Sequence, residues 1–120
     1  MTDGVSVLMP THNAMPFVRE AVHSILTQSH DALELLIVNR HSTDGTDEYL
    51  NALTDSRVRV IHRQQVGIGE ALDISLREAR YDWVARMDAD DIALPRRLER
   101  EVEFLERNPQ YALVSRACGR

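Results

Sequence analysis

Short apolar segments alternate with amphipathic, helix-like segments along almost the whole of this sequence. Val5–Met9 is apolar and we expect Pro10 to close it as a strand, whereas Ala14–Gln28 repeats apolar side chains at the spacing of one helix face. Further strands are predicted at Leu33–Val38, Val58–Ile61, Trp83–Met87 and Ala112–Val114, and further helices at Asp47–Leu53, Gly67–Arg80 and Pro95–Arg107. Such alternation with short connections predicts an α/β fold, a mainly parallel sheet with helices on both faces.

Size and composition narrow the functions that such a fold can serve. With 120 residues the chain is expected to form one domain over residues 1–120. The net charge of -5 argues against nucleic acid as a partner, because phosphate binding needs a basic face. Cys118 is the only cysteine, which excludes an internal disulfide and fits a reducing compartment. No apolar run is long enough for a membrane span and the N-terminus lacks a signal pattern, so we expect a cytoplasmic protein.

Three polar segments follow predicted strands directly. Pro10–Asn13, Asn39–Asp44 and Asp88–Asp91 each begin where an apolar run stops. In open parallel sheets, ligands bind beyond the carboxyl ends of the strands, near a reversal of strand order. Because these ends meet at one edge of the sheet, the sequence predicts a ligand site there.

The acidic run Asp88-Ala89-Asp90-Asp91 is the most distinctive of the three segments. Asp88 and Asp90, two positions apart on an extended backbone, point to the same side and can share one hard metal ion. The alternative is a solvated acidic turn before the helix that begins near Pro95. Asp91 has two equally favoured roles, in the metal site or as a cap of that helix.

Four segments together resemble the family 2 glycosyltransferases, the nucleotide-sugar enzymes of the GT-A fold. These four segments are Val5–Asn13, Ser24–Gln28, Ser42–Thr46 and Ala85–Asp91, the last followed by Leu94-Pro95 and Arg97–Glu99. The resemblance extends from about Val5 to Val114. It implies a Rossmann-like nucleotide-binding half that serves inverting transfer of a sugar from a nucleoside-diphosphate sugar, typically UDP-linked, to a hydroxyl group.

The resemblance also implies roles for individual residues. Asp90 would ligate Mg²⁺ or Mn²⁺, and Asp88 would support the ribose or the metal. A divalent ion suits this chemistry because it neutralises the charge on the diphosphate leaving group. The residues expected to contact the nucleotide are Thr11, His12, Asn13, Asn39, Arg40 and Asp88.

The sequence departs from the family pattern after the second strand. Asn39-Arg40-His41 stands where the family has two acidic residues and a glycine. Arg40 cannot accept a hydrogen bond from the base, although Asn39 can, so uridine specificity is open. Arg40 either pairs with a phosphate or is an exposed loop arginine. His12 replaces an aromatic residue that stacks on the base. It either stacks there in the same way, as an imidazole can, or is a structural histidine in the loop.

The family's second half carries the acceptor site and the general base. This chain is expected to be the donor-binding half of an incomplete domain, with the acceptor half absent, so no catalytic base is named. Exposed apolar faces of such a half make self-association an expectation. A first alternative is a non-catalytic nucleotide- or partner-binding remnant of the fold. A second alternative is a phospho-receiver domain, which needs an acid pair after the first strand and a lysine late in the chain. This chain has Pro10–Asn13 after its first strand and no lysine, which argues against that alternative.

Overall fold

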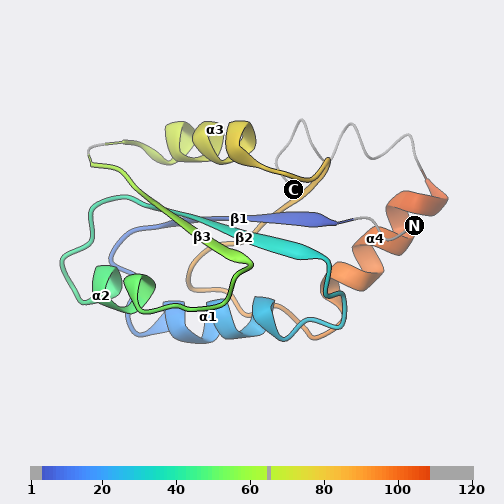
Figure 1. The fold of residues 1–120 in the computed structure, drawn as a ribbon, viewed down its shortest axis with the longest axis horizontal. Helices are drawn as coiled ribbons and strands as arrows, with labels where there is room; N and C mark the ends of the chain where they lie inside the picture. Colours follow the sequence, from blue (N-terminus) through green and yellow to red (C-terminus); the bar gives the residue numbers. More distant parts are fainter. Residues whose placement is uncertain (1–3, 65, 109–120) are drawn as a thin grey trace.

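The computed structural model describes residues 4–64 and 66–108 of the chain. Strands and helices alternate along these residues, as the sequence predicts (Figure 1). The elements are β1 (Val5–Thr11), α1 (Phe17–Leu26), β2 (Leu33–Asn39), α2 (Thr46–Asn51), β3 (Val58–His62), α3 (Ile68–Glu78), β4 (Trp83–Arg86) and α4 (Arg97–Arg107). The strand predicted at Ala112–Val114 lies outside the described residues.

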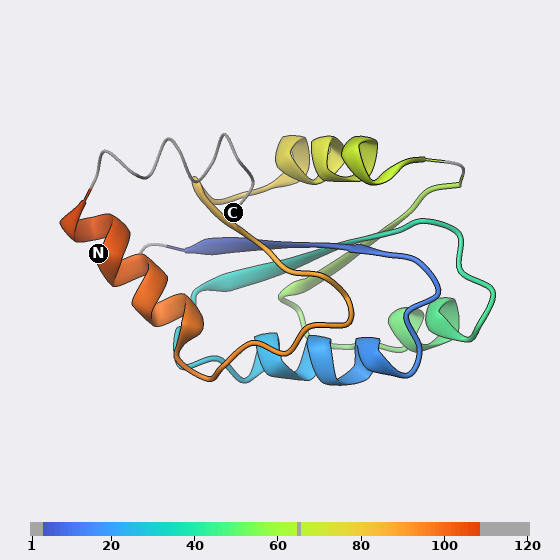
Figure 2. The same cartoon turned by 180° about the vertical axis from the view of Figure 1, so that it is seen from behind.

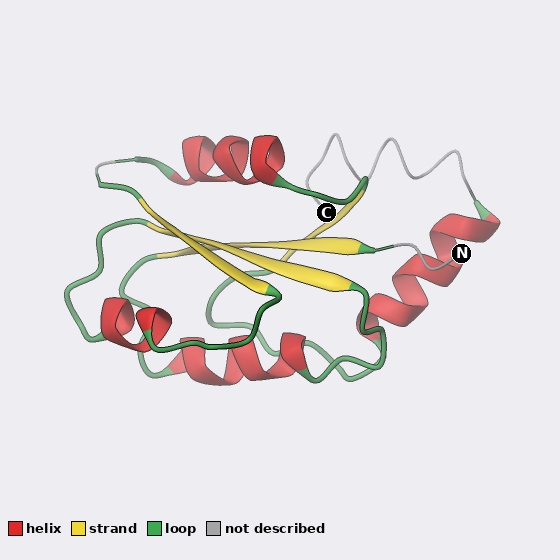
Figure 3. Ribbon diagram, in the orientation of Figure 1, coloured by secondary structure: helices red, strands yellow, loops and turns green. Residues whose placement is uncertain are grey.

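The four strands form one parallel sheet in the order β3-β2-β1-β4 (Figure 3). α3 covers one face of this sheet, and α1 and α2 lie along the other (Figures 1 and 2). The predicted α/β fold with helices on both faces is therefore confirmed. From β1 the chain adds β2 and β3 on one side of the sheet, and then β4 on the other side of β1. The carboxyl ends of β1 and β4 are therefore the switch point at which such sheets bind ligands.

The larger core lies between the sheet and α1. β1 and β2 are buried over their whole length because they occupy the middle of the sheet and are covered on both faces. The apolar stripe of α1 is buried against them, and Leu98 and Val102 of α4 join the same cluster. A smaller cluster of Leu8, Leu36 and Val84 lies on the other face of the sheet. Both helix layers thus fix the middle strands, which carry two of the predicted site segments.

The end of β1 differs from the prediction. The strand continues through Pro10 to Thr11, where Thr11 pairs with Asn39 of β2. The carbonyl of Leu8 accepts a hydrogen bond from the amide of Met87, just after β4. Backbone groups two positions apart on a strand point to the same side, so those of Pro10 also point toward the side of the sheet on which β4 lies. β4 has already ended at Arg86, and the missing N–H of Pro10 therefore costs no ladder bond.

The helices are slightly shorter than predicted. α1 begins at Phe17 because the preceding residues are held in a loop by side chains from the segment after β2. Within residues 4–64 and 66–108, no helix combines the length and apolar character needed to cross a membrane.

Candidate functional site

The loops after β1 and β2 are joined by hydrogen bonds between backbone and side chains. The Asn13 amide donates to the Ser42 hydroxyl at 2.9 Å, and the Thr43 amide donates to the side-chain oxygen of Asn13 at 2.7 Å. The Met15 amide donates to the Asp44 carboxylate at 3.0 Å. The two polar segments predicted from the sequence are thus brought together as one rigid rim.

This rim contains two residues in the left-handed region of the backbone. Asn13 has φ 45°, which asparagine adopts more readily than most residues, and His41 has φ 60°. His41 stands where the family pattern described above has a glycine. The φ of His41 is one that glycine adopts without the steric cost that a side chain brings.

His12 and Arg40 lie across from each other on the rim. The His12 Nδ1–H donates to the Arg40 carbonyl at 2.8 Å, and the Arg40 amide donates to the Thr11 carbonyl at 2.7 Å. The Arg40 guanidinium donates through Nε to the carbonyl of Val66 at 3.1 Å, which ties β2 to the loop before α3. Arg40 is half-buried and anchored, not a loosely exposed loop residue.

Thr11 and Asn39 point into the fold. The Asn39 side-chain oxygen accepts from Ser42 at 2.7 Å, while its Nδ2 donates to Asp47 and to His62 Nδ1. Thr11 is 1% exposed and its hydroxyl donates to the carbonyl of Met9. These side chains hold the loops in place, and their contact with a nucleotide stays a prediction.

Asp88, Asp90 and Asp91 lie together at the carboxyl end of β4. All three are exposed, and one carboxylate oxygen from each lies within 4.8 Å of the others. Asp88 is paired with Arg86 at 3.4 Å, and the Asp91 carboxylate accepts a bond from the Asp88 amide at 3.4 Å. Neighbouring carboxylates repel one another, and this clustering therefore favours a bound cation.

The proposed capping role of Asp91 is wrong. α4 begins at Arg97 after the N-cap Arg96, and no side-chain hydrogen bond from the N-cap closes its first turn. Asp91 instead turns back to Asp88. The turn between β4 and α4 is long enough to keep this carboxylate with the acidic group.

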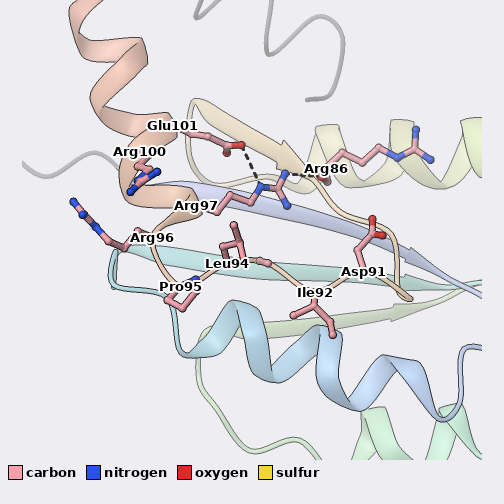
Figure 4. Close-up of a pocket in the computed structure, with 10 residues that line it drawn as sticks. Arg86, Asp91, Ile92, Leu94, Pro95, Arg96, Arg97, Arg100 and Glu101 are labelled. Atoms are coloured by element: carbon pink, nitrogen blue, oxygen red, sulfur yellow. Dashed lines mark hydrogen bonds and ion pairs between the residues drawn. The ribbon is translucent and has the colours of Figure 1, made fainter.

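A groove of about 910 Å³ lies beside the acidic turn, and Asp91 and Arg86 are on its wall (Figure 4). Arg97 crosses this region: it donates to the carbonyl of Arg86 at 3.0 Å and pairs with Glu101 at 3.1 Å. No role was assigned to Arg86 and Arg97 from the sequence, although both lie in segments that carry the family resemblance. The sequence did offer one signal, the position of Arg86 two residues before Asp88.

The acidic turn fits a hard divalent ion. It offers only carboxylate oxygens, the ligands that Mg²⁺ and Mn²⁺ prefer. Within the described ranges it is the one group of at least three His, Cys, Asp or Glu side chains placed to share an ion. Its exposure leaves room for phosphate oxygens and water to complete the ligand shell.

The sequence of this chain matches a family of known proteins. The sequence model described as Glycosyl transferase family 2 matches residues 6–119. The chain is 35% identical over 114 residues to the putative glycosyltransferase EpsE of Bacillus subtilis, covering 92% of the chain and 41% of that protein. It is 36% identical over 104 residues to the putative teichuronic acid biosynthesis glycosyltransferase TuaG of the same organism, covering 84% and 41%.

Solved structures share the fold. The mannosyltransferase PcManGT from Pyrobaculum calidifontis, in complex with GDP-Man and Mn²⁺, matches with a TM-score of 0.73 and 31% identity over 84% of this chain and 32% of that one. S. aureus TarS 1-349, in complex with UDP-GlcNAc, matches with a TM-score of 0.74 and 23% identity over 86% and 31%. The chain spans about two fifths of the lengths of EpsE and TuaG, 41% in each case. With this fold and a family match over nearly its whole length, the chain belongs to glycosyltransferase family 2.

Proposed function

We propose that this chain is the donor-binding half of a metal-dependent, inverting glycosyltransferase that acts on a nucleoside-diphosphate sugar and a hydroxyl acceptor. The observation that carries the proposal is the meeting of the Asp88, Asp90 and Asp91 carboxylates at the switch point beside β1. PcManGT, which is 31% identical to this chain, is in complex with GDP-Man and Mn²⁺.

Asp90 and Asp88 are proposed as the residues that hold Mg²⁺ or Mn²⁺, with Asp91 beside them. When bound, such an ion neutralises the negative charge of the diphosphate leaving group. Asp88 is half-exposed and its pairing with Arg86 is long, so its carboxylate is available to a ligand. The residues present therefore suit the role that the family resemblance implies.

The stagger between β1 and β4 supports a nucleotide lying across the edge of the sheet. β4 ends at Arg86 opposite Leu8, whereas β1 continues to Thr11. Three residues of strand separate these ends by about 10 Å. We propose that the base lies at the rim formed by His12, Asn13 and Arg40, with the diphosphate at the acidic turn. Thr11 and Asn39 belong to this nucleotide site through the loops that they hold.

The identity of the base depends on Arg40. A guanidinium supplies hydrogen-bond donors only, so a base recognised here must present an acceptor to it. UDP is the donor nucleotide expected from the family resemblance, and GDP is the nucleotide of the PcManGT complex. Binding of both must therefore be measured.

The acceptor site and the general base are proposed to lie in a second half, as the resemblance implies and the greater length of the relatives allows. The isolated chain exposes Ile92 and Leu94, at 62% and 75%, beside the groove. We propose that it self-associates, and sedimentation as a monomer at micromolar concentration would contradict this. Its cytoplasmic location stays a prediction.

Calorimetric titration with UDP and GDP, with Mn²⁺ or with a chelator, tests the function. We expect at least one nucleotide to bind with Mn²⁺ and to lose about tenfold or more in affinity in the chelator or in Asp90→Ala. Asp31→Ala, in the loop that leads into β2 at the other end of the strands, is the control and should bind like the wild type. Metal-independent binding, or equal binding by Asp90→Ala, would contradict the metal role. Failure of both nucleotides to bind would favour the non-catalytic alternative.

A further inference from the structure

The segment that follows the acidic turn is fastened to the end of α1 by a buried glutamine. Gln28 is 3% exposed and uses its whole amide. Its Nε2 donates to the carbonyls of Ser24 at 2.9 Å and Leu94 at 2.7 Å, and its Oε1 accepts from the Leu98 amide at 3.0 Å. One of these three bonds reaches the connection between the acidic turn and α4, at Leu94, and another reaches the first turn of α4, at Leu98.

The bond to Leu98 acts as a helix cap supplied by a residue far away in the sequence. Leu98 is the second residue of α4, and its amide has no partner within that helix. The N-cap residue Arg96 makes no side-chain capping bond. Gln28, just after the end of α1, therefore provides the acceptor that the sequence of α4 lacks.

Ser24, one turn before Gln28, holds the same segment nearer to the acidic turn. The Ser24 hydroxyl accepts from the Ala93 amide at 3.0 Å and donates to the carbonyl of Ala21 at 2.8 Å. Ser24 is 8% exposed and Ala93 is 6% exposed, so this bond lies in the core. Ala93 is only two residues beyond Asp91.

The acidic turn is thus held on both sides. Before it, the Met87 amide donates to the Leu8 carbonyl at 3.0 Å and Met87 is buried. After it, Ser24 and Gln28 hold Ala93, Leu94 and Leu98. Within the turn, the Asp91 amide donates to the Asp88 carbonyl at 3.0 Å. The contacts that involve carboxylates, between Asp88 and Arg86 and between the Asp91 carboxylate and the Asp88 amide, are both 3.4 Å long. Because close carboxylates repel, contacts from outside the turn add to its backbone bond in keeping these side chains together.

We propose that Ser24 and Gln28 are positioning residues that hold Asp88 and Asp90 in a metal-binding arrangement through the segment that follows them. This rests on the metal role proposed above. The two residues touch neither metal nor substrate, and they act by fixing the far end of the turn. Groups that orient metal ligands in this indirect way commonly set metal affinity.

The test compares Ser24→Ala and Gln28→Met with Ser75→Ala. Ser75 is a matched control because its hydroxyl makes the same kind of bond, to Ala71 of its own helix, and is equally buried, but on α3. Gln28→Met keeps the length of the side chain and loses all three bonds. Ser24→Ala is the milder variant and keeps the proposal testable if Gln28→Met does not fold.

Two measurements are made on each variant. Hydrogen exchange of the Ala93 and Leu98 amides reports whether their bonds to Ser24 and Gln28 are formed. The Mn²⁺ affinity and the electron paramagnetic resonance spectrum report the state of the metal site. We expect faster exchange at Ala93 in Ser24→Ala and at Leu98 in Gln28→Met, with a loss of about tenfold in Mn²⁺ affinity and a broadened spectrum. Ser75→Ala should match the wild type in both.

The outcomes separate this inference from the function on which it rests. If the wild type binds Mn²⁺ and both variants bind it equally well despite faster exchange, the residues are only structural and the inference is wrong. If the wild type binds no Mn²⁺, the proposed function fails and the positioning role fails with it. Unchanged exchange in the variants would show that the segment is held by other contacts, and would also overturn the inference.

Discussion

The backbone amide of Asn13 donates to the hydroxyl of Ser42 at 2.9 Å, and this bond joins the loops that follow the two middle strands. The same hydroxyl donates to Asn39 at 2.7 Å, at the end of β2. Ser42 is 7% exposed, and its hydroxyl therefore connects three segments inside the rim of the site.

Ser42→Ala should lower the free energy of unfolding by about 1–3 kcal/mol, because it leaves the Asn13 amide and the Asn39 oxygen short of a partner. Nucleotide affinity should fall with it, since the loops are no longer joined. Urea unfolding measures the loss of stability, and calorimetric titration of the folded protein measures the loss of nucleotide affinity. Thr43→Ala is the control, because the Thr43 hydroxyl makes only a contact of 3.5 Å. Equal behaviour of the two variants would contradict this role of Ser42.

His41 should be replaceable by glycine. Its φ of 60° strains a residue with a Cβ, so His41→Gly is expected to be at least as stable as the wild type. His41→Val should be less stable than His41→Gly by about 1–2 kcal/mol, because a branched Cβ fits this conformation worst. Thermal unfolding of the two variants checks the order, and a more stable valine variant would show that the backbone changes on substitution.

Asp44 should contribute to the acid sensitivity of the fold. Hydrogen bonds, first of all that from the Thr46 hydroxyl, hold the pKa of Asp44 below its ordinary value of 3.8. A carboxyl whose pKa is lower in the folded state stabilises that state above the unfolded value and loses this contribution as pH falls through the folded value. The stability difference between wild type and Asp44→Asn should therefore shrink below about pH 4.

A direct check is nuclear magnetic resonance titration of the Asp44 carboxyl in the wild type and in Thr46→Val. The pKa of Asp44 should rise in Thr46→Val, because that variant lacks the hydroxyl donor. An unchanged titration would assign the shift to the backbone bonds from Met15 and Thr46 instead.

Among the charged residues at the opposite end of the sheet, Glu34 should be the one whose replacement lowers stability most. Its carboxylate is 4% exposed, accepts from the Ser6 hydroxyl and the Arg80 amide, both at 2.6 Å, and pairs with Arg59 at 3.4 Å. Glu34→Ala should cost about 3–5 kcal/mol of stability, because it leaves these donors without an acceptor. Glu78→Ala, which removes the exposed partner of Arg59, should cost at most about 1 kcal/mol in the same denaturant experiment. Similar losses would contradict the special role of Glu34.

The sequence predicted the strands and helices well because their apolar patterns are local. The strand Val58–Ile61 was found within one residue of β3, which ends at His62. Pro10 was misjudged because its missing N–H matters only where a neighbouring strand is present, and β4 ends before reaching it. That information is tertiary and no local pattern contains it.

The acidic turn was identified from three carboxylates within four residues, which is a local signal. The role of Gln28 could not be identified in this way, because its partners Leu94 and Leu98 are 66 and 70 positions away in the sequence. The inward direction of Asn39 was also missed, since its bonds to Asp47 and His62 depend on how α2 and β3 pack. A polar side chain at the end of an apolar helix was the available signal for Gln28.

We propose that the carboxylates at the end of β4 hold a divalent ion. Mn²⁺ titration of the wild type, Asp88→Asn, Asp90→Asn and Asp31→Asn, followed by electron paramagnetic resonance, tests it most directly. We predict that Asp31→Asn binds Mn²⁺ like the wild type, and that Asp88→Asn and Asp90→Asn each lose about tenfold or more in affinity. Equal Mn²⁺ affinity in all four proteins would contradict the claim.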